Sequence, residues 1–165
     1  MARTDTIQNG HGPHRPDHWS ALPWRPYASR APLDTTADAS VFHASMLRRE
    51  LRRWLDADVT EHVAGDIILA AYEAIAEIVA LADPLDAGLI RMQAHLDDDQ
   101  VRVVISYTGS WEFSPDPDQS QRRLTLIRVL TDHASFHRDE RTITVHLTTY
   151  RQSPPQAMGD GYPSR

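Results

Sequence analysis

The stretch AYEAIAEIVALAD, from Ala71 to Asp83, is apolar on almost every side and yet carries two carboxylates. Its pattern predicts a helix that runs to about Ala82 and ends before Pro84, because a residue that precedes proline disfavours helical backbone. A helix this apolar has more than one face to bury, so we expect it to lie between a sheet and another helix. Glu73 and Glu77 are four residues apart and share a face, where like charges repel each other.

This carboxylate pair allows two interpretations. Either the two side chains carry out chemistry together, or one of them stands at a position where another residue is usual. We favour the second interpretation for Glu77. Because burying like charges is costly, replacing Glu77 by Gln is then expected to leave the fold intact or to stabilise it slightly.

The composition limits the classes of protein that the chain can belong to. Its 165 residues suffice for one domain with a core, and the formal charge of −6 argues against a nucleic-acid partner. Cysteine is absent, which excludes disulfides and thiol catalysis. We find neither a signal-like apolar core near the N-terminus nor the run of about 18 apolar residues that a membrane span needs. The expected location is therefore cytoplasmic.

Proline and glycine divide the chain into a domain with two tails. Residues 1–26 are predicted to form a flexible N-terminal tail, in which Trp19 and Trp24 either dock on the domain or bind a partner. Residues 27–151 form the predicted domain, and residues 152–165 form a C-terminal tail that we expect to be disordered.

The first elements of the domain are a short strand at 27–33 and an amphipathic helix at 35–55. The apolar stripe of this helix consists of Val41, Ala44, Leu47, Leu51, Trp54 and Leu55. Four arginines lie mostly off the stripe and form a candidate surface for an acidic partner: Arg48, Arg49, Arg52 and Arg53. The second helix follows, with Thr60 or Asp58 as its predicted N-cap.

The second half of the domain is predicted to be mostly sheet. Alternating residues at 87–96 and 100–107 indicate a hairpin, followed by an irregular loop at 108–123, a helix at 124–134 and a strand at 141–150. Strands that are neighbours in sequence pair antiparallel, and the helices can then gather on one face. The predicted fold class is α+β, a two-layer sandwich with a mostly antiparallel sheet.

This order of elements resembles the Bergerat-type ATPase fold of histidine kinases, gyrases and Hsp90 chaperones. The resemblance is stronger to the small anti-sigma-factor serine kinases of bacteria, and it extends from about Tyr27 to Arg151. In their N box, a Glu-Ala pair is followed after two residues by Asn. The sequence EAIAE provides Glu73 and Ala74, but Glu77 stands at the asparagine position.

Both glycine boxes depart from the family pattern. VVISYTGSW resembles the strand before the box Asp-x-Gly-x-Gly, with Tyr107 at the aspartate, Gly109 at the first glycine and Trp111 at the second. QRRL, at 121–124, stands where Gly-x-Gly-Leu is usual, which places Arg122 and Arg123 in the second box. The resemblance thus implies a degenerate nucleotide site, in which Glu73 is the remnant of a general base and no metal is bound.

The implied function is that of a regulatory protein that has lost ATP binding and acts on a sigma factor or an anti-sigma antagonist. It would bind no nucleic acid or membrane directly and require no cofactor. The resemblance also allows a homodimer, which the family often forms. The alternative is an active serine/threonine kinase that binds ATP and Mg²⁺ through Glu73, Glu77 and the arginines. A third possibility is a pocket for a different small ligand, narrowed by Tyr107 and Trp111.

Histidine is the remaining residue type with site potential. His133 and His137 are four residues apart, a spacing that suits a metal pair only on a helix, and we expect this segment to leave its helix. The sequence also shows no nucleophile elbow and no EF-hand loop. These features do not support a metal or hydrolase site.

Overall fold

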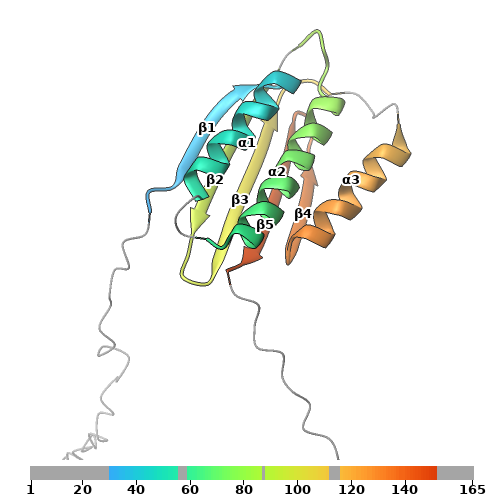
Figure 1. Ribbon diagram of the computed structural model, residues 1–165. Helices are drawn as coiled ribbons and strands as arrows, with labels where there is room; N and C mark the ends of the chain where they lie inside the picture. Colours follow the sequence, from blue (N-terminus) through green and yellow to red (C-terminus); the bar gives the residue numbers. More distant parts are fainter. Residues whose placement is uncertain (1–29, 56–58, 87, 112–115, 152–165) are drawn as a thin grey trace, which may run out of the picture.

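A computed structural model describes residues 30–55, 59–86, 88–111 and 116–151. It contains one antiparallel sheet of five strands in the order β1-β2-β3-β5-β4, with three helices on one face of the sheet (Figure 1). The predicted α+β sandwich is therefore confirmed. The predicted tails, with Trp19 and Trp24, lie outside the described residues.

The β2–β3 and β4–β5 hairpins pair with each other through β3 and β5, and β1 and β4 are the edge strands. The strands are β1 (Leu33–Asp38), β2 (Leu89–Leu96), β3 (Gln100–Thr108), β4 (His133–Arg138) and β5 (Thr142–Tyr150). Apolar residues alternate on the inner face, where Val103 pairs with Ala94 on one side and with Leu147 on the other. This alternation gives the sheet a buried face for the helices to cover.

The helices are α1 (Val41–Leu55), α2 (Glu61–Leu81) and α3 (Pro117–Leu130). α2 packs against α1, α3 and the sheet, and its central residues are almost completely buried, including Ala70, Ala74 and Ile75. This position between two helices and a sheet is the one that its apolar sequence predicted.

Three predicted boundaries at the N-terminal side were wrong. The first strand covers residues 33–38 rather than 27–33, and the first helix begins only at Val41. The hydroxyl of Ser40 accepts a hydrogen bond from the backbone N–H of His43, which caps the helix there. Val41 is 72% exposed and does not belong to the buried stripe. Of the two predicted caps of α2, Thr60 is the N-cap residue but its side chain makes no cap hydrogen bond, and Asp58 lies outside the described residues.

The region after β3 also differs from the prediction. α3 begins at Pro117, seven residues earlier than expected, because Asp116 accepts a hydrogen bond from the N–H of Gln119 and proline suits the first turn. The helix ends at Leu130, and His133–Arg138 forms the edge strand β4, which the sequence interpretation missed. Only Ala134 and Phe136 of this strand pack on the core, so its apolar alternation is short.

Candidate functional site

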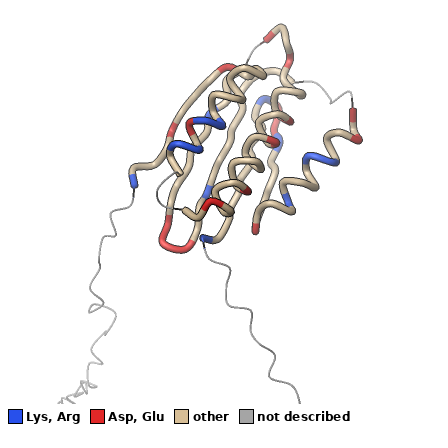
Figure 2. Tube along the Cα trace, viewed as in Figure 1, with Lys and Arg blue, Asp and Glu red and all other residues tan. Residues whose placement is uncertain are grey.

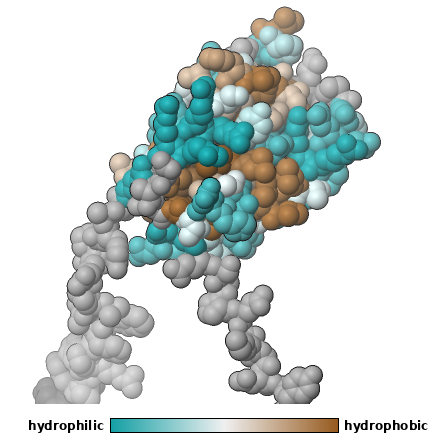
Figure 3. Space-filling model, in the orientation of Figure 1, coloured by the Kyte–Doolittle hydropathy of each residue, from teal (hydrophilic) through white to brown (hydrophobic). Residues whose placement is uncertain are grey.

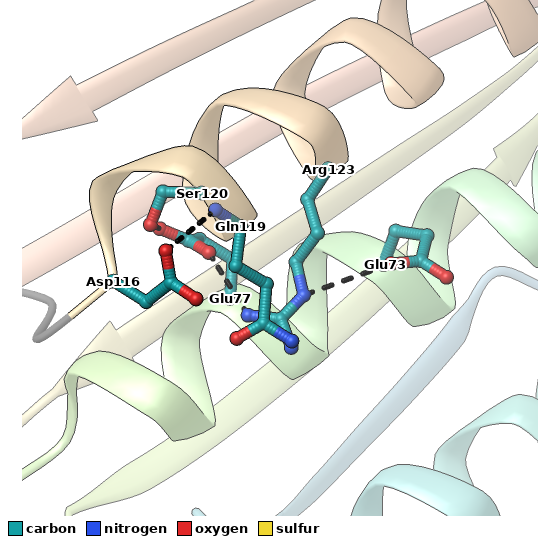
Figure 4. A network of polar contacts seen from close by, with 6 residues as sticks. All are labelled: Glu73, Glu77, Asp116, Gln119, Ser120 and Arg123. Atoms are coloured by element: carbon teal, nitrogen blue, oxygen red, sulfur yellow. Dashed lines mark hydrogen bonds and ion pairs between the residues drawn. The ribbon is translucent and has the colours of Figure 1, made fainter.

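The two carboxylates of α2 face a single arginine of α3. Nη1 of Arg123 lies 3.2 Å from Oε2 of Glu77, and its Nε lies 3.8 Å from Oε2 of Glu73 (Figure 4). The hydroxyl of Ser120 donates a hydrogen bond to the other oxygen of Glu77, at 2.7 Å. The repulsion expected between the carboxylates is thus offset by a shared cation.

Helical spacing brings this network together. Glu73 and Glu77 are one turn apart on α2, and Ser120 and Arg123 are three residues apart on α3, so each pair projects from one side of its helix. The cap at Asp116 fixes where α3 begins and hence which residues face α2. Arg123 is therefore half-buried rather than an exposed phosphate-attracting residue, whereas Arg122 is exposed.

Glu77 is the buried member of the network. The residue is only 4% exposed, and both its carboxylate oxygens have partners. The expectation that Glu77 is an unpaired replacement was wrong, because the sequence does not show that α3 brings Arg123 against it. A buried carboxylate with a hydrogen-bonded cation is an energetically acceptable arrangement.

The two carboxylates are occupied by the guanidinium of Arg123. A Mg²⁺ ion at Glu77 would have to displace this guanidinium, because the carboxylate oxygen that faces it would become the ligand. The network joins α2 to α3 through this shared cation.

Tyr107, predicted to stand at the aspartate position of the first glycine box, is a core residue in the structure. It is completely buried, and its hydroxyl donates a hydrogen bond to the backbone oxygen of Ser110 at 2.6 Å. A Cβ atom added at Gly88 or Gly109 would lie 2.5 Å from atoms of this side chain, so the phenol lies directly against both glycine backbones. Burial raises the pKa of Tyr107, because the phenolate would lose its hydration.

This packing explains why Gly109 is present. Its Cβ position is already taken by the Tyr107 hydroxyl and by the backbone of Gly88, which lies 2.7 Å away. At the two glycines the molecule therefore makes room for a tyrosine ring. The sequence predicted Tyr107 and Gly109 as positions of one nucleotide-site motif, and the structure shows that they pack against each other.

Trp111 lies just beyond the end of β3. It forms an isolated β-bridge with Ala82 at the end of α2 and packs partly buried against the core. The guanidinium of Arg138 on β4 lies over its ring, 5.6 Å from the centroid.

A cavity of about 350 Å³ lies beside the network, between α2, α3 and the β4–β5 hairpin. Its wall is mostly apolar, with Glu77 and Arg138 as the only charged residues among those that line it. The lining residues are Ala74, Glu77, Ile78, Leu81, Leu124, Phe136, Arg138, Ile143 and Val145. Figure 3 shows hydrophobic surface along the side of the molecule where α2 lies between α1 and α3.

The arginines predicted to form a partner surface all lie on α1, where Figure 2 shows the basic positions in blue. Their side chains are exposed. The guanidinium of Arg48 lies over the ring of Tyr72 on α2, 5.3 Å from its centroid. Arg49, Arg52 and Arg53 are therefore better suited than Arg48 to contacting a partner. His133 and His137, by contrast, are exposed on a strand, as the non-helical interpretation of their spacing requires.

Two site residues were missed by the sequence interpretation. Ser120 carries a signal that could have been used, because it precedes Arg123 by three residues and follows the Asp-Pro start of a helix. Arg138 carries no such signal. Its place beside Trp111 and the cavity depends on the β4–β5 hairpin, which no local pattern predicted.

Comparisons with known proteins support the fold described above. Residues 37–149 match a family model described as the histidine kinase-like ATPase domain. The crystal structure of the RsbU and RsbW domains of Rv1364c from Mycobacterium tuberculosis is similar, with a TM-score of 0.60 and 26% sequence identity. The match covers 74% of this chain and 33% of that one, so this chain spans about a third of its length. No curated protein matches the chain significantly.

In the described part of the chain, no helix has both the length and the apolar character that a membrane crossing needs.

Proposed function

This chain belongs to the histidine kinase-like ATPase family, and from that premise we propose that it is a regulatory protein of the anti-sigma-factor type that no longer binds ATP. It acts by binding another protein, either a sigma factor or an anti-sigma antagonist. The likeness to the structure that contains an RsbW domain supports this regulatory assignment.

The observation that carries the proposal is the contact between Arg123 and Glu77. In the family, the N-box residue holds Mg²⁺ and the second glycine box approaches the phosphates. Here the residues at those two positions bind each other at 3.2 Å, and Glu77 is almost fully buried. Nucleotide binding would have to break this ion pair and leave the buried carboxylate of Glu77 without its cation, which is costly.

The rest of the site supports the same conclusion. Tyr107 replaces the acidic acceptor for adenine with a buried phenol whose hydrogen bond is already made to Ser110. Each lost contact is worth about 1–3 kcal/mol, so several of them together weaken a micromolar site to about millimolar affinity or worse.

The proposed partner surface is the basic side of α1. Its exposed arginines attract an acidic surface on the partner and steer the encounter, even though the chain as a whole carries a net charge of −6. The apolar side of α1 is buried in the core, so a partner contacts the charged side without disturbing the fold.

A second candidate function is an active serine/threonine kinase with a deviant pocket. It is favoured by Glu73, whose side chain remains 21% exposed at the position of the family's general base. This function requires ATP and Mg²⁺ to displace Arg123 from both carboxylates.

Calorimetric titration with Mg-ATP and Mg-ADP separates the two functions. We expect no saturable binding below about 1 mM. Arg123→Ala serves as the comparison, since removal of the competing guanidinium exposes the carboxylates to Mg²⁺. A dissociation constant in the low micromolar range for the unaltered protein would overturn the proposal and favour the kinase.

A further inference from the structure

The cavity between α2, α3 and the β4–β5 hairpin has the size of a small-molecule site. Its 350 Å³ lie near the lower end of the range of about 300–1,000 Å³ that is typical of small-molecule pockets. The size therefore suits a small ligand.

The wall determines most of the ligand's chemistry. Seven of its nine residues are apolar or alanine, from Ala74 and Ile78 on α2 to Ile143 and Val145 on β5. Apolar ligand surface is stabilised by such a wall because it leaves water on binding. The main part of the ligand should accordingly be a hydrocarbon chain or ring.

The two charged residues of the wall differ in their partners. Glu77 is paired with Arg123 and accepts a further hydrogen bond from Ser120, so both of its carboxylate oxygens already have partners. Arg138 is exposed and lies over the ring of Trp111. Among the described residues, no acidic side chain forms an ion pair with Arg138. Its planar fork of donors matches a carboxylate.

From these observations we infer that the cavity binds a small apolar carboxylate, with the hydrocarbon part against α2 and β5 and the carboxylate on Arg138. The inference goes beyond the proposed function and rests on the cavity alone. Because the ligand would contact both α2 and α3, its binding would stabilise the packing of α3 against α2.

Octanoate is a suitable probe, with octan-1-ol as the neutral molecule of equal chain length. We expect octanoate to bind one site per chain with a dissociation constant of about 100 μM, measured by calorimetry, and to raise the melting temperature. Octan-1-ol should bind at least tenfold more weakly. Absence of saturable octanoate binding up to about 5 mM would overturn the inference.

Two pairs of variants locate the site. Arg138→Gln should weaken octanoate binding at least tenfold, while Arg128→Gln, an exposed position on α3 that does not line the cavity, should not. Leu124→Trp should fill the cavity and abolish binding, whereas Thr125→Trp, on the exposed side of the same helix, should preserve it. Melting curves identify any variant that fails to fold.

Each outcome counts for or against the assignment. Unchanged affinity in Arg138→Gln contradicts the carboxylate contact, and unchanged affinity in both Leu124→Trp and Thr125→Trp contradicts the location. Displacement of octanoate by Mg-ATP would overturn the proposed loss of nucleotide binding but would leave the location of this cavity standing. Failure of octanoate to bind would leave the proposed function untouched.

Discussion

Arg123 on α3 and Glu77 on α2 form an ion pair, with 3.2 Å between Nη1 and Oε2. Their side chains are 19% and 5% exposed, so solvent screens the pair only weakly. The ion pair thus joins the helix that covers the cavity to the central helix of the domain, and it sets the energetics of the first prediction.

Arg123→Ala should lower the free energy of unfolding by about 3 kcal/mol, because it leaves the buried carboxylate of Glu77 without its cation. Chemical denaturation measures this loss. Arg122→Ala is the matched control. Its side chain is exposed on the same helix, so we expect a change within about 0.5 kcal/mol.

Glu77→Gln should also destabilise the protein, by about 2 kcal/mol, since an amide N–H₂ would replace an acceptor facing the guanidinium. Combined with Arg123→Met, the loss should be smaller than the sum of the single losses, because each removes the same contact. Strictly additive losses, or a Glu77→Gln protein as stable as the original, would mean that the ion pair contributes nothing.

Gly109→Ala should destabilise the protein by about 1–3 kcal/mol, since its new Cβ would lie 2.5 Å from the hydroxyl of Tyr107 and 2.7 Å from the Cα of Gly88. Gly65→Ala on α2 is the control. Nothing lies within 4 Å of its Cβ position, so this change should stabilise the helix by about 0.5–1 kcal/mol. Melts of both proteins test the pair, and equal effects would contradict the close packing at Gly109.

Tyr107 should make the protein sensitive to alkali. Burial raises its pKa above the ordinary value of 10.0, so the folded state keeps the phenol protonated to a higher pH than the unfolded chain does. The stability that this contributes is complete below the unfolded pKa and is lost as the pH rises through the folded one. Tyr107→Phe should flatten the stability profile from about pH 9 upward, where the unfolded tyrosine begins to ionise, and cost about 1 kcal/mol at neutral pH through the lost hydrogen bond. A profile as steep as that of the unaltered protein would assign the alkaline loss to another group.

Trp111→Ala should lower the free energy of unfolding by about 2 kcal/mol and leave partner binding intact. The ring packs partly buried against the core and carries Arg138 on one face, so its removal leaves a gap. Melting curves and capture of the native partner by the immobilised protein test both parts. Loss of the partner with unchanged stability would make Trp111 an interface residue.

Arg49→Glu with Arg53→Glu should abolish capture of that partner without unfolding the protein. Both side chains are exposed on α1, and the charge reversal would repel an acidic surface. Arg122→Glu with Arg128→Glu makes the same charge change on exposed positions of α3 and should preserve binding. Equal loss in both double variants would show that net charge rather than the α1 surface is responsible.

The sequence by itself determined the fold class and the place of α2. Strand periodicity in β2, β3 and β5 and the apolar character of α2 are local properties, and each follows from how a single segment must bury its side chains. The sequence also led to the prediction that the family's chemical residues are replaced at positions from Glu77 and Tyr107 to Trp111. Where the alternation is weak, the prediction failed: the bounds of β1 were wrong and β4 was missed, because few residues of these strands reach the core.

Only the tertiary structure decided what those replacements do. Glu77 and Arg123 are 46 residues apart, and nothing in either segment shows that an Asp116 cap turns Ser120 and Arg123 toward α2. The packing of Tyr107 against Gly88 and the position of Arg138 at the cavity likewise depend on strands meeting in register. Local periodicity reports which face of a segment is buried. The identity of the partner atoms depends on the distances between segments, and these are determined only when the helices pack on the completed sheet.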